Sequence, residues 1–165
     1  MKSISIVDNF LDQLDFKKIQ QMFFSRKFPW YYCQGVNYTF DQNHQFVHPF
    51  SHNGKSLSEF DYELSPIYKK LNYFILVRCK SNLLVKTKTK IEHGFHIDMA
   101  DLEDYHNPKT AIFYINTNNG YTKFENGDIV ESVENRMVIF DSRINHTGST
   151  CTDKNARVVV NFNFF

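Results

Sequence analysis

The first half of the chain contains two stretches in which apolar residues recur every three or four positions, as they do along one face of an α-helix. The first predicts an amphipathic helix over about residues 10 to 25, which Pro29 ends. The second predicts a helix that starts near Ser65, because Pro66 is tolerated only in a first turn. The apolar piece "SIV" before the first helix and the aromatic runs "WYYCQGVNYTF" and "QFVHPF" between the two helices predict strands.

From Phe74 onward the pattern changes to many short apolar runs separated by Gly, Asn and Asp. These runs are "YFILVRCK", "NLLVKTKTK", "GFHID", "TAIFYIN", "YTKFE", "DIVESV", "RMVIFD", "HTGS" and "RVVVNFNFF". Strands at such regular spacing, with a hairpin signal at Asn126 and Gly127, are typical of a sandwich or barrel. No repeat, low-complexity segment or linker interrupts the chain, so we expect one domain over residues 1–165, with helices ahead of a mainly β unit.

Composition and charge narrow the class of protein. The 165 residues include 17 Phe and 9 Tyr, which is enough large apolar surface for a real core. Lys and Arg number 19 against 18 Asp and Glu. No overall field would therefore attract nucleic acid or an anionic membrane, and any partner must bind at a local site.

The three cysteines, Cys33, Cys79 and Cys151, are odd in number and widely spaced. This favours neither a disulfide framework nor a cysteine metal site. The sequence also shows neither the apolar core of a signal peptide nor the roughly 18 apolar residues that would span a bilayer. We therefore expect a cytoplasmic protein in a reducing compartment, with no membrane contact.

Two polar residues stand within the β-prone run "GFHID". Because side chains alternate across a strand, His96 and Asp98 share one face, while Phe95 and Ile97 occupy the other. An imidazole and a carboxylate that face a barrel interior lose several kcal/mol of hydration unless they are paired or bind a cation. A divalent first-row metal suits both groups, so the pair predicts two adjacent metal ligands.

A third ligand is expected at His146, which ends the apolar run "RMVIFDSRINH" and precedes the small-residue turn "TGST". With His96 and Asp98 it would complete a set of two histidines and one carboxylate, which leaves positions of an octahedral iron open for reactants. A structural site would close its shell, usually with four ligands. The pattern therefore favours a reactive metal centre.

Arg157 begins the hydrophobic run "RVVVNFNFF". An inward-facing guanidinium at this position requires an anion, and a carboxylate is its natural bidentate partner. An open iron with an arginine near it describes a site for a dicarboxylate that chelates the iron at one end. A salt bridge from Arg157 to Asp141 or Asp153 is the simpler alternative.

The ordered motifs H-x-D at 96 and 98, "FYINTNNGYTKFENG", "NRMVIFDSRINHTGST" and the terminal R-x-x-x-N strand resemble the prolyl 4-hydroxylase-like branch of the iron(II)/2-oxoglutarate dioxygenases. The resemblance covers about residues 83 to 165 and, weakly, the opening helix. It implies an α+β fold with a double-stranded β-helix (jelly roll, cupin-like) core and N-terminal helices packed on one sheet. It also implies that Fe(II), 2-oxoglutarate and O2, with ascorbate as a reductant, serve to hydroxylate a C–H bond, with succinate and CO2 as co-products.

By this resemblance His96, Asp98 and His146 are the catalytic iron ligands, and Arg157 holds the distal carboxylate of 2-oxoglutarate. Tyr114, which opens "YIN", would place its hydroxyl on the same carboxylate; an ordinary core tyrosine is the alternative. The chain departs from the family at "NNGYT", where relatives often carry "GG", and at the longer turn "TGSTCTDKNA". The cofactor site is expected to survive these departures, and they leave the substrate open.

The substrate is expected to be a peptidyl side chain or an amino-acid-like small molecule. The alternatives are a nucleobase demethylase, a non-catalytic cupin-like metal-binding module and a β-sandwich protein without metal. A demethylase would use Lys86, Lys88 and Lys90 of "KTKTK" as a basic rim. Otherwise these lysines are expected to protect an edge strand from aggregation.

A few further residues are placed by their context. Arg78 and Asn82 lie four positions apart on one predicted strand, so both would face the mouth of the site. His93 and His106 lie in polar segments and are expected on the surface. The acidic run at residues 101–104 is expected to be a solvated loop that could act as a substrate lid.

Overall fold

The structure of the protein is a computed structural model that describes residues 4–37, 41–98 and 107–165. In chain order its elements are β1 Ser5–Val7, α1 Gln13–Phe23, β2 Tyr31–Gln34, β3 His44–His52, β4 Lys55–Ser56, the 3₁₀ helix Asp61–Leu64, α2 Ser65–Leu71, β5 Leu76–Val85, β6 Lys109–Tyr114, β7 Tyr121–Phe124, β8 Ile129–Glu131, β9 Met137–Asp141, β10 His146–Gly148 and β11 Ala156–Phe164. Strands dominate, and the predicted mainly β fold is confirmed.

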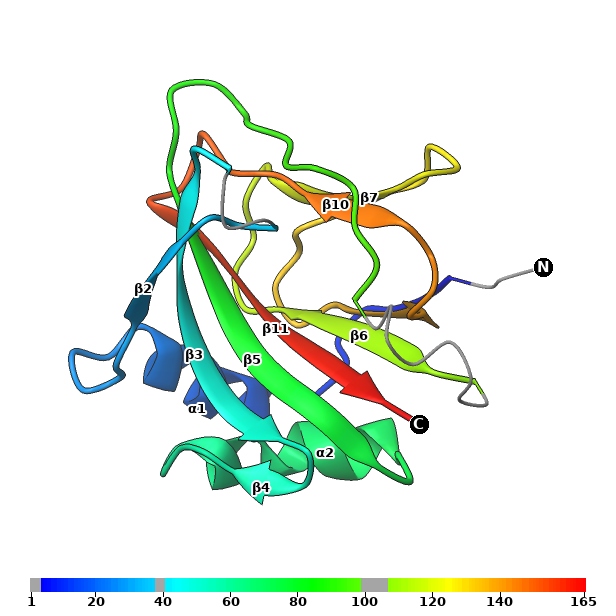
Figure 1. The fold of residues 1–165 in the computed structure, drawn as a ribbon. Helices are drawn as coiled ribbons and strands as arrows, with labels where there is room; N and C mark the ends of the chain where they lie inside the picture. The colour runs from blue at the N-terminus through cyan, green and yellow to red at the C-terminus, as the bar shows by residue number, and fades with distance from the viewer. Residues whose placement is uncertain (1–3, 38–40, 99–106) are drawn as a thin grey trace.

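The strands form two antiparallel sheets (Figure 1). The large sheet has the order β1-β9-β6-β11-β5-β3-β2, and β4 pairs with the end of β3. The small sheet has the order β10-β7-β8 and lies across from the middle of the large one (Figure 1). β11, the last strand, pairs with β5 on one side and β6 on the other. The C-terminal segment therefore completes the centre of the large sheet.

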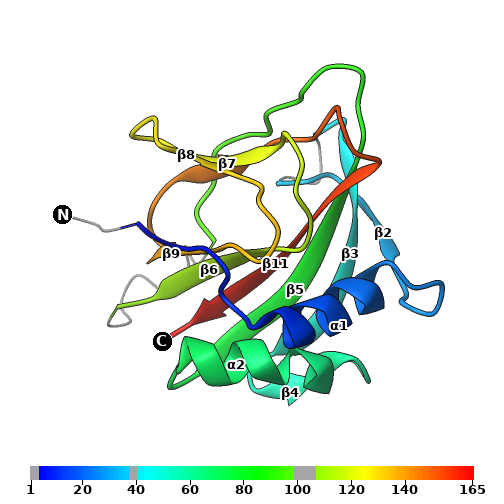
Figure 2. The same ribbon diagram turned by 180° about the vertical axis from the view of Figure 1, so that it is seen from behind.

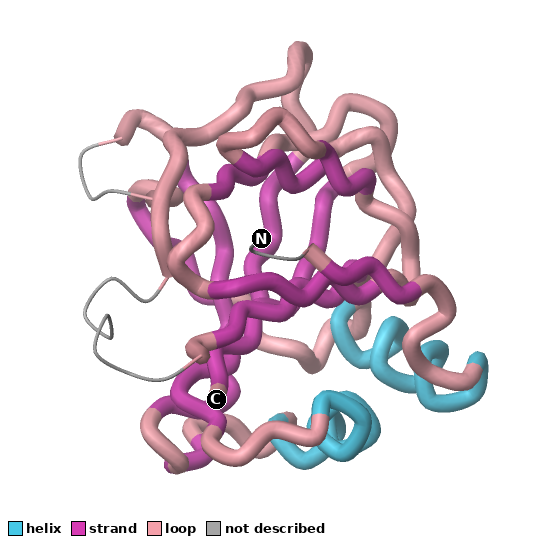
Figure 3. The backbone as a smooth tube through the Cα atoms, turned by 90° about the vertical axis from the view of Figure 1, so that its right-hand side faces the viewer, coloured by secondary structure: helices cyan, strands magenta, loops and turns pink. Residues whose placement is uncertain are grey.

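Both helices pack on the outer face of the large sheet, away from the small sheet (Figures 2 and 3). α1 begins after its N-cap Asp12, whose carboxylate accepts hydrogen bonds from the backbone amides two and three residues further on. Its buried side chains are Phe16, Ile19 and Phe23, which share one helical face. The predicted helix over residues 10 to 25 is therefore confirmed, with shorter ends.

The second helix starts where the proline predicts. α2 begins at Ser65 with Pro66 in its first turn, and it buries Ile67 against the sheet. It ends at Asn72, which adopts a left-handed φ of 49°. Neither this helix nor any other in the described ranges has the length and apolar character needed to cross a lipid bilayer.

β11 separates two interiors of different character. Val158, Val160 and Phe162 alternate along one face and join the apolar core beneath the helices. The residues that alternate with these three face the small sheet and include Arg157 and Asn161, which line a cavity. Nearly the whole strand is buried, although its two faces meet different surroundings.

Two strand predictions are wrong in detail. The runs "YFILVRCK" and "NLLVKTKTK" belong to one strand, β5, which pairs along its length with β3 and β11. It ends at Val85, so residues 86–90 form no edge strand. The run "GFHID" is not a regular strand either, because only His96 forms an isolated bridge there, to His146.

The helix-side core generates a first test. Phe113→Ala should lower the free energy of unfolding by about 3–5 kcal/mol, because the ring is fully buried and packs edge-on against Phe10 and Phe16. Phe74→Ala removes the same atoms from a side chain that is 89% exposed, and it should change that energy by less than about 0.5 kcal/mol. Equilibrium urea unfolding measures both values. Equal losses would contradict the packing described for this core.

Candidate metal centre

The three predicted metal ligands converge between the two sheets. His96 and Asp98 lie on the segment between β5 and β6, and His146 is the first residue of β10. One ligand atom from each residue lies within 4.8 Å of the other two. His96 and His146 exchange both backbone hydrogen bonds, each at 3.0 Å. The backbone alone therefore places these two distant residues side by side.

The Asp98 carboxylate receives donors from three strands. Its Oδ2 accepts hydrogen bonds from Thr110 Oγ1 on β6 at 3.2 Å. The side-chain amides of Asn161 and Asn163 on β11 donate to the same oxygen at 3.0 and 3.2 Å. Arg78 Nη2 on β5 lies 3.6 Å from Oδ1. These contacts fix the plane of the carboxylate and leave Oδ1 turned toward the metal site.

The charge of Asp98 follows from the same contacts. Burial is the largest influence and raises its pKa, but the hydrogen bond with His96 and the charges of His146 and Arg78 outweigh it. The pKa therefore lies below its usual range, and the carboxylate is ionised at neutral pH. A buried anion with one imidazole near each of its oxygens is well suited to a cation.

Both imidazoles turn Nε2 toward this carboxylate. His146 Nδ1 lies 3.1 Å from the carbonyl oxygen of Ile144, and His96 Nδ1 lies 3.4 Å from that of Gly94. Because a carbonyl oxygen only accepts, these contacts place a proton on Nδ1 in each ring and leave Nε2 as the nitrogen that a metal ion could bind. The Nε2 atoms of His96 and His146 lie 3.6 and 3.8 Å from carboxylate oxygens of Asp98. Two imidazole nitrogens and one carboxylate oxygen fit a divalent first-row metal such as iron.

Arg157 lies in the same cavity, four residues before Asn161 on β11. It is 4% exposed, and its Nε donates to Ser132 Oγ at 2.8 Å while Nη2 donates to Thr122 Oγ1 at 3.1 Å. Within the described residues it has no carboxylate partner, and the alternative of a bridge to Asp141 or Asp153 is wrong. A buried guanidinium held by hydroxyl groups alone still calls for an anion.

Tyr114, Thr122 and Gly120 surround the Arg157 side chain. The Tyr114 ring lies 5.6 Å from the guanidinium carbon, and its hydroxyl donates to Thr122 Oγ1 at 2.8 Å. Tyr114 belongs to the apolar cluster between the sheets, and Thr122 lines the cavity. The role expected for the Tyr114 hydroxyl therefore stays a prediction. A Cβ at Gly120 would lie 2.7 Å from Arg157 Cδ, so the glycine of "NNGYT" makes room for this arginine.

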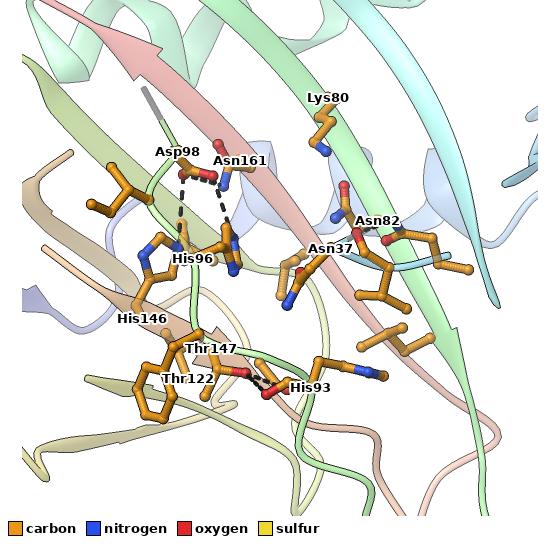
Figure 4. Close-up of a pocket in the computed structure, with 18 of the residues that line it drawn as sticks. Asn37, Lys80, Asn82, His93, His96, Asp98, Thr122, His146, Thr147 and Asn161 are labelled. Atoms are coloured by element: carbon orange, nitrogen blue, oxygen red, sulfur yellow. Dashed lines mark hydrogen bonds and ion pairs between the residues drawn. The ribbon is translucent and has the colours of Figure 1, made fainter. Parts of the chain in front are cut away.

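A cavity of about 630 Å³ is lined by the three candidate ligands, which Figure 4 labels. Arg157 lines the same cavity. Arg78 and Asn82 line it, which confirms that they share the face of β5 turned to the site. Lys80, between them in the strand, lines it as well, and the two-residue period of β5 was the signal that could have found it. Thr110 and Asn163 were also missed, although each is polar within an apolar strand.

The expectation of a surface position for His93 is wrong. Its backbone amide donates to the carbonyl oxygen of Gly148, which draws the segment against β10 and buries the imidazole. Neither ring nitrogen has a hydrogen-bond partner among the described residues, and burial lowers the pKa of the ring. His106 and the acidic run at 101–104 lie outside the described residues.

Comparison with known proteins gives a likeness in structure alone. No family model matches the chain, and no curated protein matches its sequence. A Pseudomonas putida prolyl-4-hydroxylase superimposes with a TM-score of 0.67 at 14% identity, over 99% of this chain and 93% of that one. A Burkholderia pseudomallei oxidoreductase of the 2OG-Fe(II) oxygenase family gives 0.71 at 13% identity, over 98% and 84%. A Trichoplax adhaerens prolyl hydroxylase gives 0.65 at 15% identity, over 100% and 84%.

The chain has the jelly-roll fold of the 2-oxoglutarate–iron(II) oxygenases. The predicted fold class, a double-stranded β-helix with N-terminal helices on one sheet, is thereby confirmed. Identities this low establish the fold and do not transfer an activity. An activity can therefore be inferred only from the residues that line the cavity.

The buried, unpaired ring of His93 can be tested by its effect on stability. His93→Leu should leave the free energy of unfolding of the metal-free protein unchanged or raise it, because an apolar side chain replaces a buried polar ring without partners. His48 is a matched control, since it is 2% exposed and its ring nitrogens contact Pro29 O at 2.8 Å and Ser58 Oγ at 2.7 Å. His48→Leu should cost about 1–3 kcal/mol in urea unfolding. A comparable loss in both variants would contradict the unpaired state of His93.

Proposed function

We propose that the protein is an iron(II)- and 2-oxoglutarate-dependent dioxygenase that hydroxylates a C–H bond of a peptidyl or small-molecule, amino-acid-like substrate. One oxygen atom of O2 would enter the product, and the other would enter succinate as 2-oxoglutarate loses CO2. The observation that carries the proposal is the placement of ligand atoms of His96, Asp98 and His146 within 4.8 Å of one another, in a cavity that Arg157 also lines with no carboxylate partner among the described residues.

The candidate ligands favour an open metal rather than a closed structural site. His96 Nε2, Asp98 Oδ1 and His146 Nε2 are the three atoms assigned to iron, and no fourth His, Cys, Asp or Glu of the described residues joins the group. Three protein ligands leave positions of an octahedral ion for a chelating co-substrate and for O2. The bound iron would supply the oxidising chemistry.

The remaining residues orient and shield the reactants. Arg157 is placed to receive the far carboxylate of 2-oxoglutarate, with Thr122 beside it and the Tyr114 ring behind it. Leu84, Ile112 and Val159 give the cavity apolar walls that exclude water. Thr110, Asn161 and Asn163 hold the Asp98 carboxylate in one plane, so the ligand geometry is set before a metal binds. 

The substrate and cellular setting belong to the same proposal. The Trichoplax adhaerens structure is a complex with a peptide fragment of a hypoxia inducible factor, which supports a peptidyl substrate as one option. The three cysteines are free thiols, which suits a reducing cytoplasm where iron stays ferrous and ascorbate serves as reductant. A nucleobase demethylase is disfavoured, because the lysines expected to form its basic rim are not on a strand beside the site.

Turnover of the co-substrate tests the enzyme directly. Purified protein with Fe(II), ascorbate and 2-oxoglutarate should release succinate, and His96→Ala and Asp98→Ala should each reduce that release by at least about a hundredfold, as expected for loss of a direct metal ligand. Mn(II) should raise the melting temperature of the wild type and leave both variants unchanged.

The exposed His52 on β3 provides the matched control, and His52→Ala should behave as the wild type in both measurements. Metal binding without succinate release would point to the cupin-like binding module instead. Undiminished release by His96→Ala would overturn the iron assignment.

Arg157 should determine the affinity for 2-oxoglutarate. Arg157→Gln should raise the dissociation constant of 2-oxoglutarate by about 10- to 100-fold, because a hydrogen bond to a charged group contributes about 1.5–3 kcal/mol. Titration calorimetry of the Mn(II)-loaded protein measures this constant. Mn(II) affinity itself should not change, and the exposed Arg26→Gln should alter neither value. A 2-oxoglutarate affinity equal to that of the wild type would show that another group binds the co-substrate.

A further inference from the structure

Lys80 lies in the cavity with no assigned role. It shares the inner face of β5 with Arg78 and Asn82, and its amine turns into the cavity that holds the candidate metal ligands (Figure 4). Across the sheet it pairs in register with Asn161 on β11, whose amide donates to Asp98. Lys80 is therefore one strand away from the group that orients the carboxylate ligand.

The ammonium of Lys80 has no ion-pair partner among the described residues, although the charge of Asp98 acts on it from a distance. It is half-buried, and no described residue forms an ion pair or hydrogen bond with it. Burial, and then the neighbouring charge of Arg78, lower its pKa. The carboxylate of Asp98 is already shared by Arg78, two asparagines and a threonine. An uncompensated cation at this depth costs free energy unless a ligand supplies the opposite charge.

The charge of the cavity as a whole also indicates that a ligand supplies negative charge. Its described lining contains three cationic side chains, Arg78, Lys80 and Arg157, and a single carboxylate, Asp98. A divalent metal and the dianion of 2-oxoglutarate cancel each other. The loaded cavity would therefore keep an excess of positive charge, which favours a second ligand that places a carboxylate beside one of these cations.

The co-substrate does not account for Lys80. Under the proposed function, 2-oxoglutarate uses one carboxylate at the metal and the other at Arg157. Arg157 pairs across β11 with Leu84, whereas Lys80 pairs with Asn161, so the two cations lie four residues apart along the strands. That separation is about 13 Å between backbones. Lys80 is therefore free for a different molecule on the other side of the metal site.

Two carboxamides beside Lys80 indicate which other groups that molecule carries. Asn161 lines the cavity, its amide nitrogen is committed to Asp98, and its Oδ1 is a buried acceptor without a donor among the described residues. Asn82 Oδ1 is likewise buried without a partner among the described residues. Asn82 and Lys80 are about 7 Å apart along β5, which one small molecule can bridge. Acceptors of this kind take a hydrogen bond from an N–H or O–H donor, and an amino group supplies several N–H donors at once.

We propose that Lys80 binds the carboxylate of the primary substrate and that this substrate is a free amino acid, whose nitrogen donates to the carbonyl oxygens of Asn161 and Asn82. This inference rests on the proposed function and narrows it, because a residue within a peptide has neither a free α-carboxylate nor a free amino group. The carboxylate would neutralise Lys80, and the amino group would satisfy the two acceptors. The side chain would then project toward the metal.

The test uses the paramagnetism of Mn(II) as a reporter of binding near the metal. The probes are the twenty common L-amino acids and their C-terminal amides, added without O2 to protein loaded with Mn(II) and 2-oxoglutarate. Proton signals of at least one amino acid should broaden, and those of its amide should not. Lys80→Met should raise the dissociation constant of that amino acid by about 10- to 100-fold. Lys80→Arg should restore part of the affinity.

Two controls separate this inference from the proposed function. Lys88→Met, at an exposed lysine, should leave amino-acid binding at the wild-type level. Lys80→Met should keep the wild-type affinity for 2-oxoglutarate, and its melting temperature should be no lower than that of the wild type, because the variant removes a buried charge. The inference is overturned, and the dioxygenase stands, if 2-oxoglutarate binds and the succinate assay is positive but the proton signals of no amino acid broaden. The same conclusion follows if the amides bind as well as the acids. A loss of 2-oxoglutarate affinity in Lys80→Met also overturns it. Absence of both metal and 2-oxoglutarate binding overturns the dioxygenase and the inference together.

Discussion

The burial of one carboxylate is the constraint on which the site depends. Asp98 is ionised inside the molecule because the imidazoles of His96 and His146 lie beside it and because hydroxyl, amide and guanidinium groups reach it from β5, β6 and β11. Those three strands are neighbours in the middle of the large sheet, so the donors converge only when the sheet is complete. The opposite side of the site is supplied by the small sheet, through the backbone bridge between His96 and His146. The metal centre is thus a product of the whole fold rather than of one motif.

The sequence predicts much of this arrangement because its strongest signals are chemical. His96, Asp98, His146 and Arg157 are polar or charged residues in apolar surroundings, and each is costly to bury without a purpose. The structure brings all four into one cavity. The two helices are likewise predictable, since α1 carries a capping aspartate and a three-to-four-residue apolar period, and α2 carries a proline in its first turn.

Other features depend on contacts that no local pattern contains. His93 lies in a polar segment, yet a backbone hydrogen bond to Gly148 buries it. Lys80 has the sequence context of a solvent-exposed strand lysine, and only the pairing of β5 with its neighbours shows that its face of the strand lines the cavity. The run "GFHID" has the alternation of a strand but finds only one bridging partner, so tertiary placement overrides its local preference. In each case the missing information is which distant segment lies alongside.

Both faces of β11 are constrained in sequence. Its helix-facing valines and phenylalanine complete the main apolar core, while its arginine and asparagines shape the cavity. Little in this strand can vary without disturbing either packing or chemistry. Divergence toward new substrates would therefore be confined to β3 and the outer part of β5, where cavity-facing residues such as Gln45 and Asn82 hold no part of the metal centre. An engineer who wishes to change what the cavity accepts would begin at that wall and leave the C-terminal strand as it is.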